Sequence, residues 1–113
     1  LLMRGNEECL LVYPGSEMEK FSAKFAELPS TDRSAQAYIR MFLSSMSQCD
    51  FDSQGRILIP AELRKYAGLE KEAVIIGAYN RVEIWNKDKW EAYTSAATEN
   101  YNAILDDMTR FGI

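Results

Sequence analysis

Short runs of apolar residues, each bounded by polar or turn-forming residues, recur four times along the chain. They are Leu1–Arg4, Leu10–Tyr13, Val74–Tyr79 and Val82–Trp85. Runs of this length are typical of β-strands rather than helices. A turn containing Gly5 follows the first run, and Asn80-Arg81 separates the last two. The pattern therefore predicts two strand pairs, one near each end of the chain.

Other apolar residues recur at spacings of three and four, as in amphipathic helices. After Glu17 they form a helix that Pro29 ends, with the stripe Met18, Phe21, Phe25 and Leu28. Ser30 or Thr31 can cap a second helix, with the stripe Ala35, Tyr38, Ile39, Phe42, Leu43 and Met46. Asn86 can cap one last helix, with the apolar side Trp90, Tyr93, Ala97, Tyr101, Ile104, Leu105 and Met108. We interpret these aromatic residues as core or subunit interface.

The middle of the chain is expected to form a compact strand–turn–strand–helix unit. Its parts are Gln48–Phe51, the turn Asp52–Gly55, the strand Arg56–Ile59 and the helix Ala61–Ala67. Pro60 suits the first position of that helix, and Gly68 suits its C-terminal end.

The chain also matches itself when it is shifted by 72 positions. The facing segments are Leu1–Gly5 with Ala73–Gly77, Leu10–Tyr13 with Val82–Trp85, and Met18–Phe21 with Trp90–Tyr93. We therefore divide the chain into a first half-repeat with a helical pair, residues 1–47, and a second repeat with a C-terminal helix, residues 48–113. The counterpart of Cys49–Gly68 would fall before Leu1, so we expect the chain to begin inside a repeat.

Composition narrows the classes of function. A hydrophobic fraction of 47% suits a globular protein, and no apolar run approaches the roughly 20 residues of a membrane span. The net charge of −4 argues against a nonspecific polyanion binder. Residues 50–68 are better balanced, with three positive and three negative side chains.

Nothing in the sequence indicates catalysis. It contains no histidine, nucleophile elbow, phosphate-binding glycine loop or metal-ligand cluster. We therefore expect no enzyme, cofactor, metal site or small-molecule substrate. Cys9 and Cys49 match no metal or redox spacing and are interpreted as small buried hydrophobes in a reducing cytosol. A disulfide between them is the alternative that the sequence leaves open. A catalytic carboxylate pair of Asp50 and Asp52 is a weak alternative to a non-enzymatic function. Alternation would place both residues on one strand face beside a turn.

The residue types in the turn that begins at Asp52 suit a tight turn followed by a strand. The Asp52 carboxylate can accept hydrogen bonds from the backbone of the turn, and Gly55 can supply a positive φ. Arg56 then stands at the start of a strand, where its side chain can pair with Asp52 or point outward. Ile57 and Ile59 share one face of that strand.

The segment Asp52–Arg64 resembles the DxxxR element of AbrB-like swapped-hairpin domains, which transition-state regulators, MazE-type antitoxins and MraZ share. Its context, with a helical pair before it and Tyr66–Glu72, Val74–Gly77 and Asn80–Trp85 after it, resembles the MraZ family over essentially the whole chain. The resemblance implies an α+β fold, an AbrB/MazE-like double-split β-barrel of two pseudo-repeats with helices packed outside.

The MraZ family consists of bacterial regulators that bind repeated sites upstream of the division and cell-wall gene cluster, usually as repressors. The resemblance implies a cytoplasmic, nucleoid-associated protein with two partners, double-stranded DNA and further copies of itself in a ring-like oligomer. It implies no membrane association.

The resemblance also assigns residues to the DNA-binding site. Arg56 is the DNA-contacting arginine, and its planar fork suits a base edge or a phosphate. Arg64 and Lys65 are candidates for phosphate contacts, although an ordinary solvated helix face is the favoured alternative for both. Ser53 and Gln54 are candidates for contacts from the turn. For Arg56, a purely structural ion pair is the alternative.

Two other functions remain open on the same hairpin fold. One is an antitoxin-like module, and the other is a structural protein-interaction module without a role in DNA binding. Antitoxins typically pair one hairpin with a disordered tail that wraps the toxin. An aromatic-rich final helix, running to Ile113, favours self-assembly instead.

Overall fold

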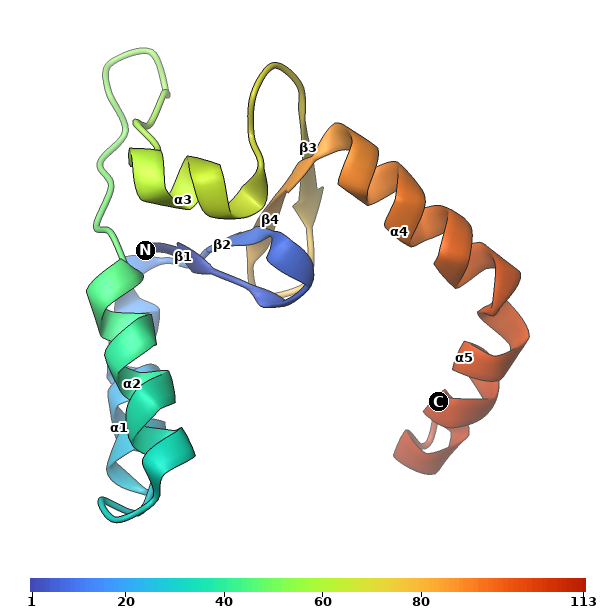
Figure 1. Ribbon diagram of the computed structural model, residues 1–113, viewed down its shortest axis with the longest axis horizontal. Coiled ribbons are helices and arrows are strands. Elements are labelled where there is room, and N and C mark those ends of the chain that lie inside the picture. The colour runs from blue at the N-terminus through green and yellow to red at the C-terminus, as the bar shows by residue number, and fades with distance from the viewer.

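Four strands form one antiparallel sheet in the computed structural model, which describes residues 1–113. They are β1 (Leu2–Arg4), β2 (Leu10–Val12), β3 (Ala73–Gly77) and β4 (Val82–Asn86). The strand order is β1-β2-β4-β3, so each predicted hairpin is formed and the two hairpins join through β2 and β4 (Figure 1). The two predicted strand pairs and the α+β class are confirmed.

Helices make up most of the remaining chain. The α-helices are α1 (Met18–Ala26), α2 (Arg33–Ser45), α3 (Ala61–Ala67), α4 (Lys87–Glu99) and α5 (Tyr101–Met108). Three single 3₁₀ turns are η1 (Asn6–Glu8), η2 (Gly15–Glu17) and η3 (Thr109–Phe111). None of the helices is long and apolar enough to cross a membrane.

The N-terminal cap of α4 agrees with the sequence prediction, whereas the N-terminal cap of α2 does not. Asn86 accepts a hydrogen bond from the Lys89 backbone N–H at 3.0 Å, which confirms it as the cap of α4. For α2 the prediction of Ser30 or Thr31 was wrong, because Asp32 accepts the capping bond. A carboxylate is well suited to this position, since it also faces the positive end of the helix dipole.

The predicted last helix is two helices. Asn100, with φ of −103° and ψ of 18°, leaves the helical conformation and separates α4 from α5. Its side chain donates to the Ala96 carbonyl at 3.2 Å, a local bond that competes with the helical backbone. The apolar spacing continues across Asn100, which is why the pattern alone predicted one helix.

The two faces of the sheet carry different layers. On one face α3 packs over the sheet, in a buried cluster of Leu2, Leu10, Leu63, Ala67 and Ile84. On the other face lie α1 and α2, in a cluster of Leu1, Met3 and Phe42 joined by Leu11, Tyr13, Met18, Phe21, Phe25 and Met46. Residues of β1 alternate between the two clusters, as the period of a strand requires.

The two strands predicted over Gln48–Phe51 and Arg56–Ile59 are not formed. Both segments are extended arms without regular secondary structure, and one backbone hydrogen bond, from Asp52 N–H to the Arg56 carbonyl, joins them. Just before them, Ser47 exchanges two backbone hydrogen bonds with Leu2. A strand needs a neighbouring strand for its backbone groups, and Arg56–Ile59 has none within this chain.

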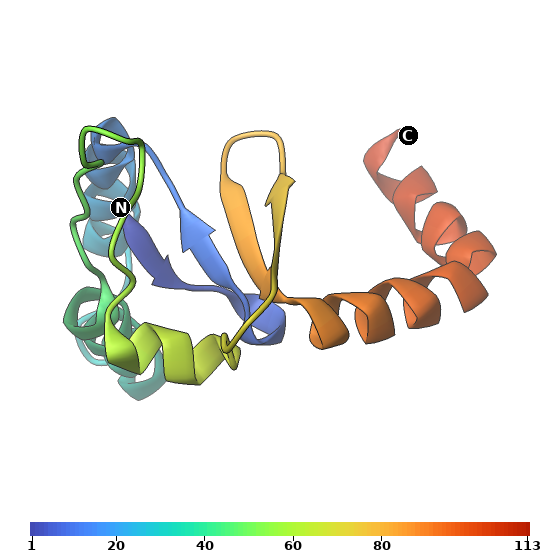
Figure 2. The same ribbon diagram turned by 90° about the horizontal axis from the view of Figure 1, so that it is seen from above.

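The chain is open rather than spherical. Helices α1 and α2 form one projection from the sheet, and α4 and α5 form another (Figure 1). Seen from above, α4 runs away from the hairpins and α5 turns at its far end (Figure 2). The radius of gyration is 16.2 Å, against about 13 Å for a compact domain of this length. Much apolar surface on the helices is consequently exposed.

Candidate nucleic-acid interface

The turn at Asp52 is held by its own carboxylate. One carboxylate oxygen, Oδ1, accepts from the backbone N–H groups of Gln54 and Arg56, each at 2.9 Å. The Gly55 N–H donates to the Asp52 carbonyl at 3.0 Å, and Gly55 has φ of +75°. Glycine adopts this conformation without the steric cost that a side chain brings. In this structure Asp52 and Gly55 therefore hold the turn through these bonds and this backbone conformation.

The second carboxylate oxygen of Asp52 holds the side chain of Arg56. The Arg56 Nε–H donates to Asp52 Oδ2 at 3.1 Å. Hydrogen bonds from the backbone of Arg56 and then of Gln54, with a smaller one from the Arg56 side chain, hold the pKa of the Asp52 carboxyl below its ordinary value. Asp52 therefore stays ionised and anchors the arginine at neutral pH.

Arg56 is paired and exposed at the same time. Its side chain is 71% exposed, and only Nε contacts the carboxylate. The two terminal amino groups of the guanidinium are the ones that donate in bidentate recognition. An exposed ion pair of this kind contributes little to stability. The pair therefore orients Arg56 without occupying its terminal donors.

The other residues predicted to contact DNA differ in how close they lie to this turn. Ser53 and Gln54 form its exposed tip. Arg64 and Lys65 are exposed on α3 and form no ion pair. Arg64 lines the same groove as Gly55, so the structure places it near the turn, whereas Lys65 does not line that groove. Contact of any of these residues with DNA stays a prediction.

An apolar groove beside the turn was not foreseen from the sequence. It has a volume of about 490 Å³. One wall is formed by Phe51, Ile57 and Ile59 of the extended arms, and the other by residues of the sheet, Val12, Ala73, Ile75, Val82 and Ile84. Ile75, on the edge strand β3, is 70% exposed. The alternation of Ile57 and Ile59 predicted that they share one face, but not that this face would contact the sheet.

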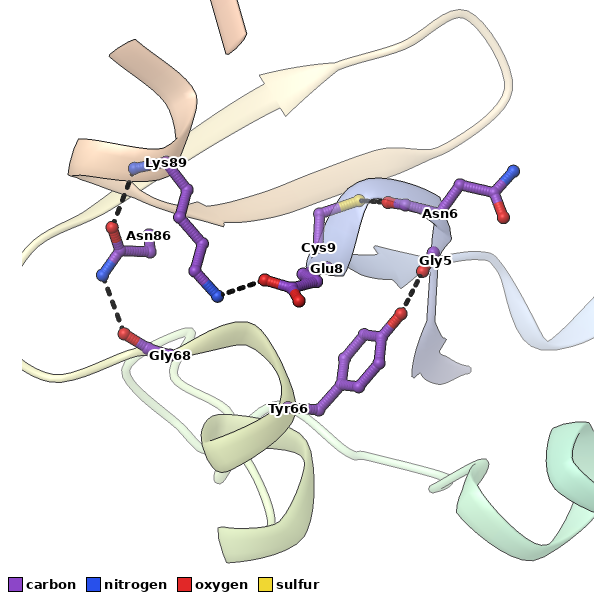
Figure 3. A network of polar contacts seen from close by, with 8 residues as sticks. All are labelled: Gly5, Asn6, Glu8, Cys9, Tyr66, Gly68, Asn86 and Lys89. Carbon is purple, nitrogen blue, oxygen red and sulfur yellow. Dashed lines mark hydrogen bonds and ion pairs between the residues drawn. The ribbon is translucent and has the colours of Figure 1, made fainter. Parts of the chain in front are cut away.

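Helix α3, which follows the turn, is anchored to both hairpins (Figure 3). The Tyr66 hydroxyl donates to the Gly5 carbonyl, between β1 and β2, at 2.6 Å. At the end of α3, the Asn86 side-chain amide donates to the Gly68 carbonyl at 2.8 Å. These bonds fix one end of the unit that carries Arg56 to the sheet.

The chain contains no group of three or more histidine, cysteine or acidic side chains that could hold a metal ion. Cys9 and Cys49 are both free. Cys9 is buried, and this burial, with a smaller effect of the nearby Glu83 carboxylate, raises the pKa of its thiol to about 11. Cys9 is therefore a neutral, packed thiol at physiological pH.

Comparison with known proteins agrees with the resemblance. The model of the family described as "MraZ protein, putative antitoxin-like" matches residues 42–111. A protein of Halothermothrix orenii named Transcriptional regulator MraZ is 46% identical over 110 residues, 97% of this chain and 77% of that protein. Proteins of the same name from Pediococcus pentosaceus and Pelotomaculum thermopropionicum are 43% and 49% identical over 100% and 96% of this chain, and over 79% and 74% of their own lengths. These relatives are named as regulators and not as enzymes, as expected for this chain. The chain therefore belongs to the MraZ family.

Proposed function

We propose that this chain is a sequence-specific DNA-binding transcriptional regulator that acts in the cytoplasm on nucleoid DNA. In this proposal it represses the bacterial division and cell-wall gene cluster, by binding repeated operator sites as an oligomer. The observation that carries the proposal is the geometry of Arg56, oriented by Asp52 through Nε and 71% exposed. The relatives named Transcriptional regulator MraZ support the same function.

In this mechanism Arg56 enters a groove of the DNA and donates from its terminal amino groups to a base edge or a phosphate. Asp52 is a positioning residue, because it limits the orientations that Arg56 can adopt before DNA binds. Ser53 and Gln54 at the tip add polar contacts, and Arg64 and Lys65 on α3 contact phosphates. Such phosphate contacts fix the register on the duplex and carry little sequence information.

The register of the sheet supports the proposed two-repeat barrel, with residues 1–47 and 48–113 as its parts. Leu11 pairs with Glu83, 72 positions away, which is the shift at which the sequence matches itself. The flanking pairs, Leu10 with Ile84 and Val12 with Val82, exchange under the same shift. A two-fold axis through the central pair therefore relates β2 to β4, as a double-split barrel of pseudo-repeats requires. The outer strands are offset by one residue, because Leu2 pairs with Val12 whereas Val74 pairs with Trp85 and not with Ile84.

This axis relates the two halves of one sheet face. Helix α3 and the extended arms cover the half that contains Leu2 and Leu10. The equivalent half contains Val82 and lines the apolar groove. In the proposed barrel a second strand–turn unit of the same pattern fills that groove and pairs with the backbone of Ile57–Ile59.

Oligomerisation is part of the proposed mechanism because one subunit offers few cationic contacts and a net charge of −4. Several linked contacts on repeated sites raise the overall affinity by two or more orders of magnitude without a new contact. The exposed large apolar side chains on α4, α5 and η3 supply surface for assembly. They are Tyr93, Tyr101, Ile104, Leu105 and Phe111.

The test is binding of the full chain to a fluorescent duplex with three repeated operator sites, compared with a scrambled duplex of the same composition. We expect the native protein to prefer the repeated sites and Arg56→Ala to lose at least tenfold in affinity. Arg40→Ala is the matched control, because Arg40 is also exposed and has no polar partner. Equal affinity of native protein and Arg56→Ala would overturn the assignment of Arg56.

A protein-binding module is the second candidate function. The apolar groove favours it, as does the phrase "antitoxin-like" in the family description. Two results together would support this function. The native chain would show no preference for operator DNA, and substitutions in the groove would change its association with a protein.

A further inference from the structure

The start of α4 is bonded to two segments that lie far from it in the sequence. Asn86, which precedes α4, donates from its side-chain amide to the Gly68 carbonyl at 2.8 Å, at the end of α3. Three residues on, the Lys89 ammonium donates to the Glu8 carboxylate at 2.6 Å, in the turn between β1 and β2 (Figure 3). The first turn of α4 is therefore linked to α3 and to the β1–β2 hairpin at once.

Asn86 joins α4 to α3 through both ends of one amide group. Its Oδ1 accepts from the Lys89 backbone N–H and caps α4, while its Nδ2 donates to Gly68. Gly68 ends α3 with φ of +66° and leaves room for the Lys89 side chain. A Cβ at this position would lie only 3.2 Å from Lys89 Nζ, so a larger residue would crowd the ammonium.

Glu8 contacts Lys89 from a strained backbone conformation. Glu7 and Glu8 both have positive φ, 61° and 59°, which side chains other than glycine rarely adopt. The corresponding turn of the β3–β4 hairpin has one such residue, Tyr79. The additional strained residue is thus the one whose carboxylate contacts Lys89. Strain of this kind persists where surrounding contacts hold it, and it is concentrated at functional positions.

The other contacts of α4 hold it to its own hairpin. The rings of Trp90 and Tyr93 lie 5.2 and 5.1 Å, between centroids, from the ring of Trp85 on β4. Lys87 pairs with Glu72, directly before β3, at 3.1 Å. The bonds of Asn86 and Lys89 are the side-chain hydrogen bonds that link this helix to α3 and to the β1–β2 hairpin.

The direction of α4 relative to α3 matters for a protein that assembles on repeated sites. Helix α3 follows the turn that carries Arg56, whereas α4 runs away from the hairpins and leads to the apolar side chains of α5 (Figure 2). In an assembly through α4 and α5, this direction sets the distance between the Arg56 side chains of neighbouring copies. Linked contacts raise affinity only where the geometry lets them engage together.

We propose that Glu8, Asn86 and Lys89 form a joint that fixes the direction of α4 relative to α3, and thereby the spacing of Arg56 in an assembly. All three are positioning residues, which act through Arg56. An exposed ion pair contributes little to stability, so the role of the Lys89–Glu8 pair is to orient α4. The consequence for DNA rests on the proposed function, whereas the fixed direction of α4 is a property of the chain itself.

Two spin labels measure this direction in the full chain. They are attached through Glu62→Cys on α3 and Ser95→Cys on α4, both at exposed positions. Cys49→Ser removes the accessible native thiol, and Cys9 is buried. An excess of unlabelled chain leaves one labelled copy in each assembly. Pulsed electron paramagnetic resonance should then give one narrow distribution of distances between the labels.

Substitutions in the joint should widen this distribution roughly twofold. Asn86→Asp keeps an oxygen that caps α4 and suits the helix N-terminus, but it loses the donor to Gly68. Lys89→Met keeps the length of the side chain and loses the charge. Lys87→Met is the matched control, because it breaks an ion pair of the same helix turn that stays within the β3–β4 hairpin. Its distribution should remain as narrow as that of the native chain.

Exchange of the two charges separates orientation from a general loss of stability. Glu8→Lys combined with Lys89→Glu restores an ion pair, so it should restore the narrow distribution that Lys89→Met loses. An unchanged width in both Asn86→Asp and Lys89→Met, or an equal widening in Lys87→Met, overturns the joint.

The consequence for DNA is measured with duplexes that carry two operator sites at several spacings. The native chain should prefer one spacing, and Asn86→Asp should lose most of that preference while its affinity for a single site stays nearly unchanged. The same spacing preference in Asn86→Asp and the native chain would overturn the link to DNA binding. A native chain without preference for operator DNA would contradict the proposed function, and the distance distributions alone would then decide the joint.

Discussion

The Tyr66 hydroxyl and the Gly5 carbonyl are joined by a 2.6 Å hydrogen bond across 61 positions of the chain. Tyr66 belongs to α3, which follows the Asp52 turn, and Gly5 belongs to the turn between β1 and β2. The bond thereby links the unit that carries Arg56 to a hairpin from the other end of the sequence. The same tyrosine ring supports the guanidinium of Arg4.

Removing this hydroxyl tests the strength of the link. Tyr66→Phe keeps the ring beneath Arg4 but leaves the Gly5 carbonyl without its donor. We expect the free energy of unfolding to fall by about 1 kcal/mol. Tyr79→Phe is the control, because Tyr79 is fully exposed and should change stability by less than about 0.5 kcal/mol. Urea denaturation measures both, and equal stabilities of the two variants would contradict the link.

The Asp52 carboxyl should titrate below its ordinary value. Backbone hydrogen bonds from Arg56 and Gln54 favour the charged form. Because the pKa is lowered on folding, the stabilisation by this group is present above the unfolded pKa of about 3.9. It is lost as the pH falls through the lower folded value. Carboxyl-detected NMR should give a midpoint below 3.8, and the Arg56 amide should shift in parallel. Asp52→Asn should abolish both transitions, and a midpoint above 3.8 would show that the turn is not held this way.

Local features of the fold were accessible from the sequence, whereas long-range features were not. The hairpins and the Asp52 turn depend on neighbours within a few positions, so apolar runs and the Asp-x-x-Gly-Arg spacing predict them. The break at Asn100 was missed because the apolar spacing continues through it. The arms around the turn were predicted as strands from alternation, which does not reveal whether a strand has a partner.

In the candidate site, too, local contacts were predicted from the sequence and long-range contacts were not. Arg56 and its carboxylate were predicted because they lie on one turn. The stacking of Arg4 on Tyr66 brings together residues from distant segments, and no sequence pattern marks either residue. The β2–β4 pairing is also long-range. Its central pair, Leu11 with Glu83, is nevertheless separated by the same 72 positions as the sequence repeat.

The two thiols should differ strongly in reactivity. With a pKa of about 11 against an ordinary 9.0, Cys9 has about 100-fold less thiolate at pH 8 than an unperturbed thiol, and its side chain is also buried. We expect a disulfide reagent to modify Cys49 first and Cys9 only when the protein unfolds. Cys49→Ser should therefore abolish the fast phase, and Cys9→Ala should leave it intact. A fast phase that persists in Cys49→Ser would show that Cys9 is accessible.

Ile75 tests whether the apolar groove takes part in assembly. It lies on the edge strand β3 and lines the groove, where an aspartate would place a charge on apolar surface. We expect light scattering to show an oligomer for the native chain and smaller species for Ile75→Asp. Tyr79→Asp is the matched control, because Tyr79 is exposed and does not line the groove. Unchanged assembly of Ile75→Asp would place the interface elsewhere, with the α4–α5 surface as the next region to test.

Replacing Arg56 by lysine separates the possible roles of its guanidinium. Lysine keeps the charge but lacks the planar fork, so it cannot pair with Asp52 and donate bidentately at the same time. If Arg56 contacts a base edge, Arg56→Lys should lose most of the preference for operator over scrambled DNA, while the dependence of affinity on salt stays nearly unchanged. If Arg56 contacts a phosphate, Arg56→Lys should bind both duplexes almost normally. In that case Arg56→Ala should reduce the slope of log affinity against log salt by about one. Measuring both variants on both duplexes at several salt concentrations therefore distinguishes a sequence-specific contact of Arg56 with a base edge from a contact with a phosphate.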